Sequence, residues 1–226
     1  MATHTALEAT HDAVCFDMDG VIVDSEDYWV ELEREQLLPT VVPDHEVSVS
    51  EVTGLNYREI YDYLEETYGT AVSREEFLAI FEDAARDLYG ERVSLLAGFT
   101  DLLTELETRA VSTAIVSSSP PAWIDLVRER FALDGAFDAI VSAEGIDGPG
   151  KPEPDIYEVA ADLVGVPIGD CVAIEDSSHG LAAAAAAGAT VIAYEIDAHD
   201  GVDYAPADVV VDDPAALSAA VLEAVS

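Results

Sequence analysis

The chain has 226 residues, half of them hydrophobic, which suits one globular domain or one domain carrying an insert. Its 47 acidic residues against 9 basic ones give a formal net charge of −38, which argues against nucleic-acid binding because phosphates would be repelled. No apolar stretch is long enough to span a bilayer and no secretory signal is recognisable, so we expect a cytoplasmic protein without a membrane partner.

The first predicted element is a buried strand over residues 13–17, an apolar run that ends in Asp-Met-Asp-Gly. From about residue 24 to residue 91 apolar residues recur at three- and four-residue spacing, with no strand pattern between them. This stretch is predicted to form a helical cap, with helices over residues 26–38, 57–68 and 73–89.

Beyond residue 91, strand-like runs alternate with helical patterns, as in βαβ units around a parallel sheet. We therefore predict an α/β fold: a Rossmann-like parallel-sheet core of residues 1–23 and 92–226, with an inserted helical cap of residues 24–91. The alternative is that the helical stretch forms the second half of one core. The later strands are predicted over residues 112–117, 139–142, 171–175, 190–194 and 208–211, and helices over 120–131, 154–164 and 177–187.

Two carboxylates, Asp17 and Asp19, follow the first predicted strand one residue apart. Residues i and i+2 of an extended segment point to the same side, so the two groups repel each other unless a cation or a shared proton lies nearby. The pattern indicates a hard divalent metal site, in which one carboxylate attacks and the other handles protons. An EF-hand loop also begins Asp-x-Asp, but Val21 and Ile22 occupy its next ligand and glycine positions.

Polar residues also follow other predicted strands, and in open α/β sheets ligands bind beyond the carboxyl ends of the strands. Residues 117–119 are serines just before a predicted helix, where hydroxyls and backbone N–H groups form an anion site or simply cap the helix. Lys151, the only lysine, lies in a turn stiffened by glycine and proline. Glu175 and Asp176 bring further carboxylates to the same edge.

Together these groups indicate a metal-assisted phosphoryl site. In this interpretation Asp17 and Asp176 bind the metal, and Asp17 attacks phosphorus while Asp19 protonates the leaving oxygen. The remaining phosphate oxygens are held by Ser117, Ser118 and Lys151.

Four segments, in order, resemble the four motifs of the haloacid dehalogenase superfamily: residues 16–26, Ser117, residues 151–154 and residues 174–177. The similarity is greatest to the branch containing beta-phosphoglucomutase and phosphoglycolate or sugar-phosphate phosphatases. It implies that Asp17 is the nucleophile, forming an aspartyl-phosphate, and that Asp19 is the general acid/base. It also implies phosphate binding by Ser117 and Lys151, and Mg²⁺ held by Asp17, the Asp19 backbone carbonyl and Asp176, with Glu175 as a helper.

Two positions bear on the substrate. Trp29 stands where the resembled beta-phosphoglucomutases carry a histidine, which weakens the mutase interpretation. Residues 53–58 resemble the family's substrate-specificity loop, so Arg58 is expected either to contact the distal group of the substrate or to be an exposed helix-face arginine.

We therefore expect a Mg²⁺-dependent phosphatase that acts on a small phosphorylated metabolite, as a monomer or weak dimer. The alternatives are a beta-phosphoglucomutase-like mutase and a non-catalytic acidic protein that binds a basic partner. The acidic residues are spread along the whole chain, which favours adaptation to molar salt over a surface matched to a basic partner. Cys15 and Cys171 lie in apolar runs and are expected to be buried thiols.

Overall fold

The computed structural model describes residues 10–52, 57–198 and 201–225. It divides into two compact units: the core unit, Met1–Asp24 with Ser94–Ser226, and the helical unit, Ser25–Val93. These boundaries lie one or two residues from those of the predicted cap, 24–91. That the helical unit serves as a cap stays a prediction.

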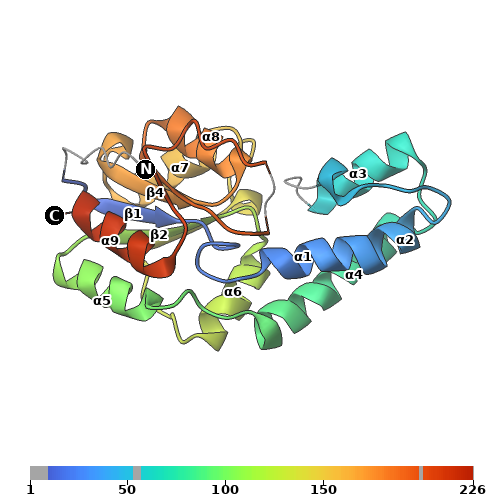
Figure 1. Cartoon of the computed structure of the whole chain (residues 1–226), viewed down its shortest axis with the longest axis horizontal. Helices are drawn as coiled ribbons and strands as arrows, with labels where there is room; N and C mark the ends of the chain where they lie inside the picture. Colours follow the sequence, from blue (N-terminus) through green and yellow to red (C-terminus); the bar gives the residue numbers. More distant parts are fainter. Residues whose placement is uncertain (1–9, 53–56, 199–200, 226) are drawn as a thin grey trace. The chain divides into compact units, whose positions relative to one another are not determined.

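The core unit is built on a six-stranded parallel sheet with the strand order β3-β2-β1-β4-β5-β6 (Figure 1). The predicted α/β fold is confirmed, and the apolar runs that predicted the strands are buried because helices cover both faces of the sheet. Four strands have the predicted bounds, while the first ends and the last begins one residue inside them. The strands are β1 (Ala13–Phe16), β2 (Ser112–Ser117), β3 (Ala139–Ser142), β4 (Cys171–Glu175), β5 (Thr190–Tyr194) and β6 (Val209–Val211).

Helices α7 and α8 cover one face of the sheet, and α5 and α9 cover the other (Figure 1). Of the α-helices in the described residues of the core unit, α5 and α9 lie in segments for which no element was predicted. Short 3₁₀ turns at Ala143–Gly145 and Ile168–Asp170 complete this unit. The helices are α5 (Phe99–Thr108), α6 (Pro121–Arg130), α7 (Asp155–Val164), α8 (Ser178–Ala187) and α9 (Pro214–Ala224).

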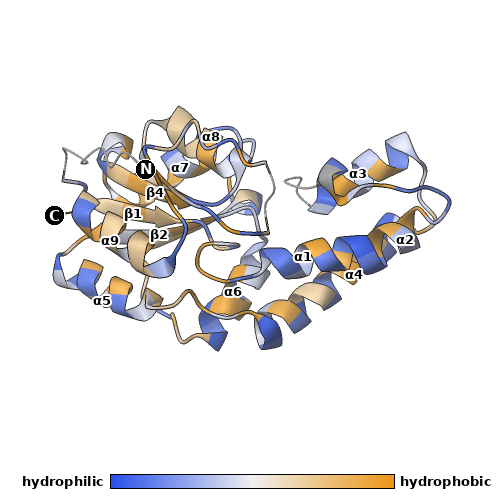
Figure 2. Cartoon of the chain, in the orientation of Figure 1, coloured by the Kyte–Doolittle hydropathy of each residue, from blue (hydrophilic) through white to orange (hydrophobic). Residues whose placement is uncertain are grey.

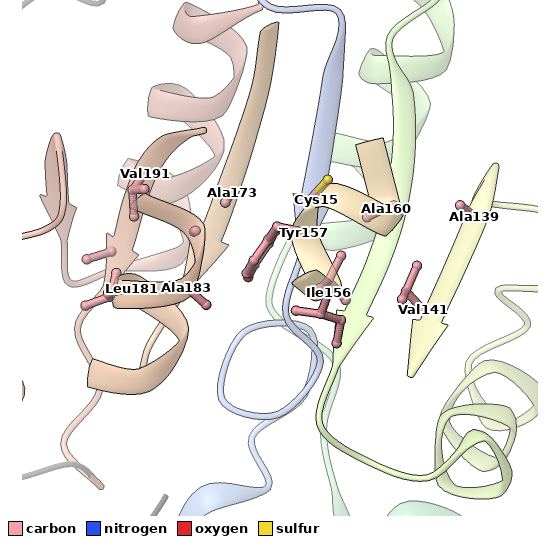
Figure 3. Close-up of a cluster of buried hydrophobic side chains, with 14 residues drawn as sticks. Cys15, Ala139, Val141, Ile156, Tyr157, Ala160, Ala173, Leu181, Ala183 and Val191 are labelled. Carbon is pink, nitrogen blue, oxygen red and sulfur yellow. The ribbon is translucent and has the colours of Figure 1, made fainter. Parts of the chain in front are cut away.

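Alternate strand residues face opposite layers of the core. Cys15 belongs to a buried cluster with Tyr157 of α7 and the small residues Ala183 and Ala184 of α8 (Figure 3). The next residue of β1, Phe16, meets the ring of Phe99 of α5 edge-on, with 5.2 Å between the ring centroids. Figure 2 shows the hydrophobic strands of the sheet, with polar and hydrophobic residues alternating along α5 and mostly hydrophobic residues along α8.

The chain leaves and re-enters the core unit at one place. The Asp24 N–H donates to the Ser94 carbonyl at 3.2 Å, and the Ser94 N–H donates to the Asp24 carboxylate. Val23 and Leu95 form an antiparallel bridge beside this junction. The two ends of the inserted segment are therefore joined to each other within the core unit.

The helical unit differs from the predicted pattern at its first helix. A single helix was predicted over residues 26–38, whereas the chain forms α1 (Glu26–Leu32), a π-helical segment (Glu33–Leu37) and the short α2 (Leu38–Val41). Pro39 has no N–H to donate, and just before it the Leu38 N–H bonds the carbonyl five residues back, at Glu33.

The other predicted helices of this unit are α3 (Tyr57–Thr67) and α4 (Arg74–Asp87), with a short 3₁₀ turn at Val49–Glu51 before them and a second π-helical segment, Leu88–Arg92, after them. Ser73 and Glu76 form a capping box at the start of α4.

No helix in the described part of the chain is long and apolar enough to cross a membrane. Cys15 and Cys171 are free and buried, as predicted.

Candidate active site

The site begins where β1 ends. The Asp17 N–H donates to the Ile174 carbonyl at 3.0 Å, which continues the strand to the carboxyl edge of the sheet beside β4. A tight turn follows, closed by a hydrogen bond of 2.8 Å from the Gly20 N–H to the Val23 carbonyl. Gly20 has φ +74°, and a Cβ at this position would overlap the Asp176 carboxylate. Glycine is therefore required both for the turn and for the approach of Asp176.

Lys151 lies between two carboxylates at this edge. Its Nζ is 2.5 Å from Asp17 Oδ1 and 2.6 Å from Glu175 Oε1, and it donates to the Val116 carbonyl at 2.9 Å. Only 5% of the lysine side chain is exposed. Burial by itself would lower the pKa of Lys151, but the charges of Asp17 and Glu175 outweigh it and raise that pKa, so the side chain is a cation.

Glu175 is fully buried, and hydrogen-bond donors surround its carboxylate. Besides Lys151, the Tyr157 hydroxyl donates to Oε1, and the Ser177 hydroxyl donates to Oε2 at 3.4 Å. A Cβ at Gly180 would overlap the same carboxylate, so the first turn of α8 leaves room for it. Ser177 also caps this helix by accepting a hydrogen bond from the Gly180 N–H.

Three buried carboxylates, from Asp17, Glu175 and Asp176, lie together at this edge, with one oxygen of each within 4.8 Å of the others. Burial raises the pKa of Asp17 well above its usual range, Lys151 opposes the shift, and the charges of Glu175 and Asp19 add to it. A divalent cation would relieve this repulsion. An all-oxygen donor set in the space that Gly20 leaves fits a hard cation such as Mg²⁺.

The serines after β2 do not cap α6, whose N-cap residue is Pro120 without a side-chain cap. Ser117 is buried, and its Oγ accepts the Ser119 N–H at 3.0 Å, whereas Ser118 is exposed. The Ser119 hydroxyl donates to Asp19 Oδ2 at 2.7 Å, and the Ser142 hydroxyl donates to the Ser119 carbonyl at 2.7 Å. Ser119 was predicted only as a member of the serine triplet, and its contact with Asp19 was not predicted.

The signal for Ser119 was the serine triplet, but only the local turn decides which of its hydroxyls reaches Asp19. The structure brings one set of predicted residues together at the carboxyl edge of the sheet. That set comprises Asp17, Asp19, Ser117, Lys151, Glu175 and Asp176.

Of the other predicted residues, Ser118 is exposed beside Ser117, while Arg58 and Trp29 belong to the helical unit. Arg58 belongs to α3 of the helical unit, with its guanidinium 5.0 Å from the centroid of the Tyr57 ring, and a substrate contact for it stays a prediction. Residues 53–56, which were predicted to begin the specificity loop, are outside the described residues. Trp29 stacks on Phe81 at 5.6 Å and donates through Nε1 to the Tyr89 hydroxyl at 3.1 Å, so it packs within the helical unit.

Comparison with known proteins identifies the family of this chain. The family described as "Haloacid dehalogenase-like hydrolase" matches residues 14–194. Hexitol phosphatase B of Escherichia coli (strain K12) is 30% identical over 178 residues, which cover 77% of this chain and 79% of that protein. Beta-phosphoglucomutase of Bacillus subtilis (strain 168) is 31% identical over 188 residues, covering 78% of this chain and 80% of that protein.

Two further similar proteins differ in how much of their own length this chain matches. Protein SUPPRESSOR OF QUENCHING 1, chloroplastic, of Arabidopsis thaliana is 31% identical over 194 residues, but these span 80% of this chain and only 17% of that protein. The crystal structure of CbbY from Rhodobacter sphaeroides in complex with phosphate superposes with a TM-score of 0.79 at 23% identity, covering 92% of this chain and 96% of that one. The latter similarity supports the fold.

Proposed function

Because the chain belongs to the haloacid dehalogenase-like hydrolase family, we propose that it is a Mg²⁺-dependent phosphatase that hydrolyses a small phosphorylated metabolite. One observation carries this proposal: Lys151, a buried cation, lies 2.5 Å from Asp17, the carboxylate that stands in the nucleophile position of the family motif. The relative named hexitol phosphatase B supports a phosphorylated sugar alcohol or sugar as the substrate class.

In the proposed reaction Asp17 attacks the phosphorus atom, and the ester P–O bond breaks as Asp19 gives a proton to the leaving oxygen. Asp19 then takes a proton from water, whose oxygen attacks the phosphorus of the aspartyl-phosphate. This second step frees inorganic phosphate and restores the Asp17 carboxylate. Lys151 and the hydroxyls of Ser117 and Ser118 hold the phosphate oxygens in both steps.

The proposed Mg²⁺ ligands are Asp17, Asp176 and the backbone carbonyl of Asp19. When bound, Mg²⁺ supplies positive charge that offsets the charge of the phosphoryl group. The Glu175 carboxylate already receives hydrogen bonds from Lys151, Tyr157 and Ser177, which supports a helper role in which it fixes Lys151.

A sugar-phosphate mutase is the second candidate, because a beta-phosphoglucomutase is 31% identical to the chain. The same aspartyl-phosphate would then pass its phosphoryl group to a second sugar hydroxyl. The position of Trp29 argues against this, since the side chain packs against Phe81 and Tyr89 where the resembled mutases have a histidine.

We also propose that the protein works in the cytoplasm at molar salt. The acidic side chains that give the net charge of −38 repel one another and also repel an anionic substrate. Both repulsions are screened at high ionic strength.

The test is phosphate release by the purified protein in molar KCl, with and without Mg²⁺. The panel is a hexitol phosphate, β-glucose 1-phosphate and p-nitrophenyl phosphate. We expect Mg²⁺-dependent release that falls at least about 1,000-fold in Asp17→Asn, because covalent catalysis is lost. Asp101→Asn, an exposed acid of α5, is the matched control.

A bisphosphate intermediate and glucose 6-phosphate as products from β-glucose 1-phosphate would favour the mutase. No turnover of any substrate would favour the non-catalytic acidic binding protein. Near wild-type hydrolysis by Asp17→Asn would refute the assignment of the nucleophile.

A further inference from the structure

Ser119 is anchored on both sides of its Cα. Its N–H donates to Ser117 Oγ at 3.0 Å, and its carbonyl accepts the Ser142 hydroxyl at 2.7 Å. These contacts tie the residue to the ends of β2 and β3. Ser119 is also buried, with 8% of its surface exposed. The backbone of Ser119 is therefore held in a fixed place at the carboxyl edge of the sheet.

From that place the hydroxyl reaches Asp19 Oδ2 at 2.7 Å. The backbone of Asp19 is fixed as well, because the turn after β1 is closed by the Gly20 and Ile22 N–H groups and a bridge joins Asp19 to Val23. A turn fixes the backbone but leaves the carboxyl group able to rotate about its side-chain bonds. The hydrogen bond from Ser119 restricts that rotation.

A hydroxyl suits a partner whose protonation changes during a reaction. It donates to an ionised carboxylate, and it accepts from a protonated one because its oxygen also has lone pairs. An ammonium or a backbone N–H can only donate, so each would favour the ionised form alone. In the proposed reaction Asp19 is an acid in the first step and a base in the second, and Ser119 can hold it in both states.

We propose that Ser119 is a positioning residue for Asp19, holding the carboxyl group for proton transfer to the leaving oxygen. This inference rests on the proposed function. It assigns a role to Ser119 that differs from the phosphate binding assigned to Ser117 and Ser118.

The leaving group distinguishes this role from a general structural one. An alkyl phosphate must give up an alkoxide, which needs the proton of Asp19. p-Nitrophenyl phosphate releases a stabilised phenolate that does not. The value of kcat/KM reports the steps up to the first chemical transfer, so it isolates this requirement from the later hydrolysis of the aspartyl-phosphate.

The experiment compares kcat/KM of Ser119→Ala for a hexitol phosphate and for p-nitrophenyl phosphate, with Mg²⁺ in molar KCl. We expect a loss of about 10- to 100-fold for the hexitol phosphate, a part of what a general acid contributes, and less than about threefold for p-nitrophenyl phosphate. Ser119→Thr keeps the hydroxyl and should restore most of the loss. Ser112→Ala, the same change at the other end of β2, should alter neither value.

Equal losses on both substrates, or no loss on either, would overturn the inference. Weaker competitive inhibition by inorganic phosphate in Ser119→Ala would also overturn it, because Ser119 would then bind phosphate. Asp19→Asn should show the same dependence on the leaving group, only larger. If Asp19→Asn shows no such dependence, the general acid of the proposed function is wrong. If only Ser119→Ala lacks it, the positioning role alone is wrong.

Discussion

Lys151 Nζ lies 2.6 Å from Glu175 Oε1, so the ammonium group that contacts Asp17 is also held by a second, fully buried carboxylate. The lysine therefore has two tasks. It neutralises charge inside the core unit, and it presents a positive charge next to Asp17.

Replacing the lysine should affect both tasks. In Lys151→Ala the carboxylates of Asp17 and Glu175 stay buried without their cation, and we expect unfolding free energy to fall by about 3–5 kcal/mol. We expect kcat/KM to fall by the equivalent of about 2–4 kcal/mol, the scale of an electrostatic group in an active site. Urea unfolding and steady-state kinetics measure these two losses.

Two further variants test the assignment. Lys151→Arg should not restore activity fully, because a planar guanidinium does not replace a compact ammonium. Arg74→Ala removes a cation from an exposed ion pair with Asp62 and should cost less than about 1 kcal/mol of stability. Unchanged kinetics in Lys151→Ala would refute phosphate binding by this residue.

Tyr157→Phe removes one hydrogen-bond donor from the buried Glu175 carboxylate and leaves the ring in place. A buried acceptor short of a donor destabilises a fold by about 1–3 kcal/mol, and we expect a loss of that size. Thermal and urea unfolding measure it. Tyr204 is partly buried and packs against the apolar cluster that contains Tyr157 and Cys15. Tyr204→Phe is the control and should lose much less stability. Equal stability of Tyr157→Phe and the wild type would show that the hydroxyl adds nothing.

The free energy of unfolding should depend on pH because of Glu33 in the helical unit. This side chain is 8% exposed, and burial, with a smaller contribution from Glu26, raises its pKa from 4.5 to about 7. The folded state therefore holds this proton more tightly than the unfolded state does. Its contribution to stability is complete below pH 4.5 and is lost as the pH rises to about 7.

Glu33→Gln cannot ionise, so its advantage over the wild type should grow from near zero at pH 4.5 to about 3 kcal/mol at pH 8. Urea unfolding of both proteins across this pH range measures the difference. Glu35→Gln removes the same charge from an exposed position of the same segment and should show little pH-dependent gain. An advantage of Glu33→Gln that is constant with pH would contradict the raised pKa.

Salt should increase both stability and substrate affinity. The Debye length falls from about 10 Å at 0.1 M salt to about 3 Å at 1 M, so acidic self-repulsion and repulsion of the phosphate both become local. We expect the melting temperature to rise and KM to fall between these KCl concentrations. Thermal melts and kinetics at fixed free Mg²⁺ measure both. Values that stay flat or worsen would favour a basic partner as the reason for the acidic composition.

The sheet was predictable from sequence because its strands are buried on both faces and appear as short apolar runs. Runs such as 112–117 and 171–175 have the same bounds in the structure. The first cap helix was less predictable, since apolar spacing alone does not show that the ladder changes to π-helical hydrogen bonds before Pro39. The amphipathic helix α5 was also left out of the prediction.

The candidate site was predictable to the level of strand ends. Carboxylates at the ends of β1 and β4 meet because parallel strands end at the same edge of the sheet. The contacts of Tyr157 and Ser119 were not predictable. Each contact depends on how a helix or turn orients one hydroxyl toward a carboxylate that is distant in the sequence. The order of residues along the chain does not directly give the distance between the two groups.

The junction at Asp24 and Ser94 has an evolutionary consequence. The two ends of the intervening segment are hydrogen-bonded to each other beside the turn that carries Asp17. For the sheet and this turn, the segment is therefore equivalent to a closed loop. Insertions, deletions or wholesale exchange of Ser25–Val93 need not strain that turn. An evolving lineage can thereby exchange one inserted segment for another while Asp17 and the neighbouring strand ends remain where they are.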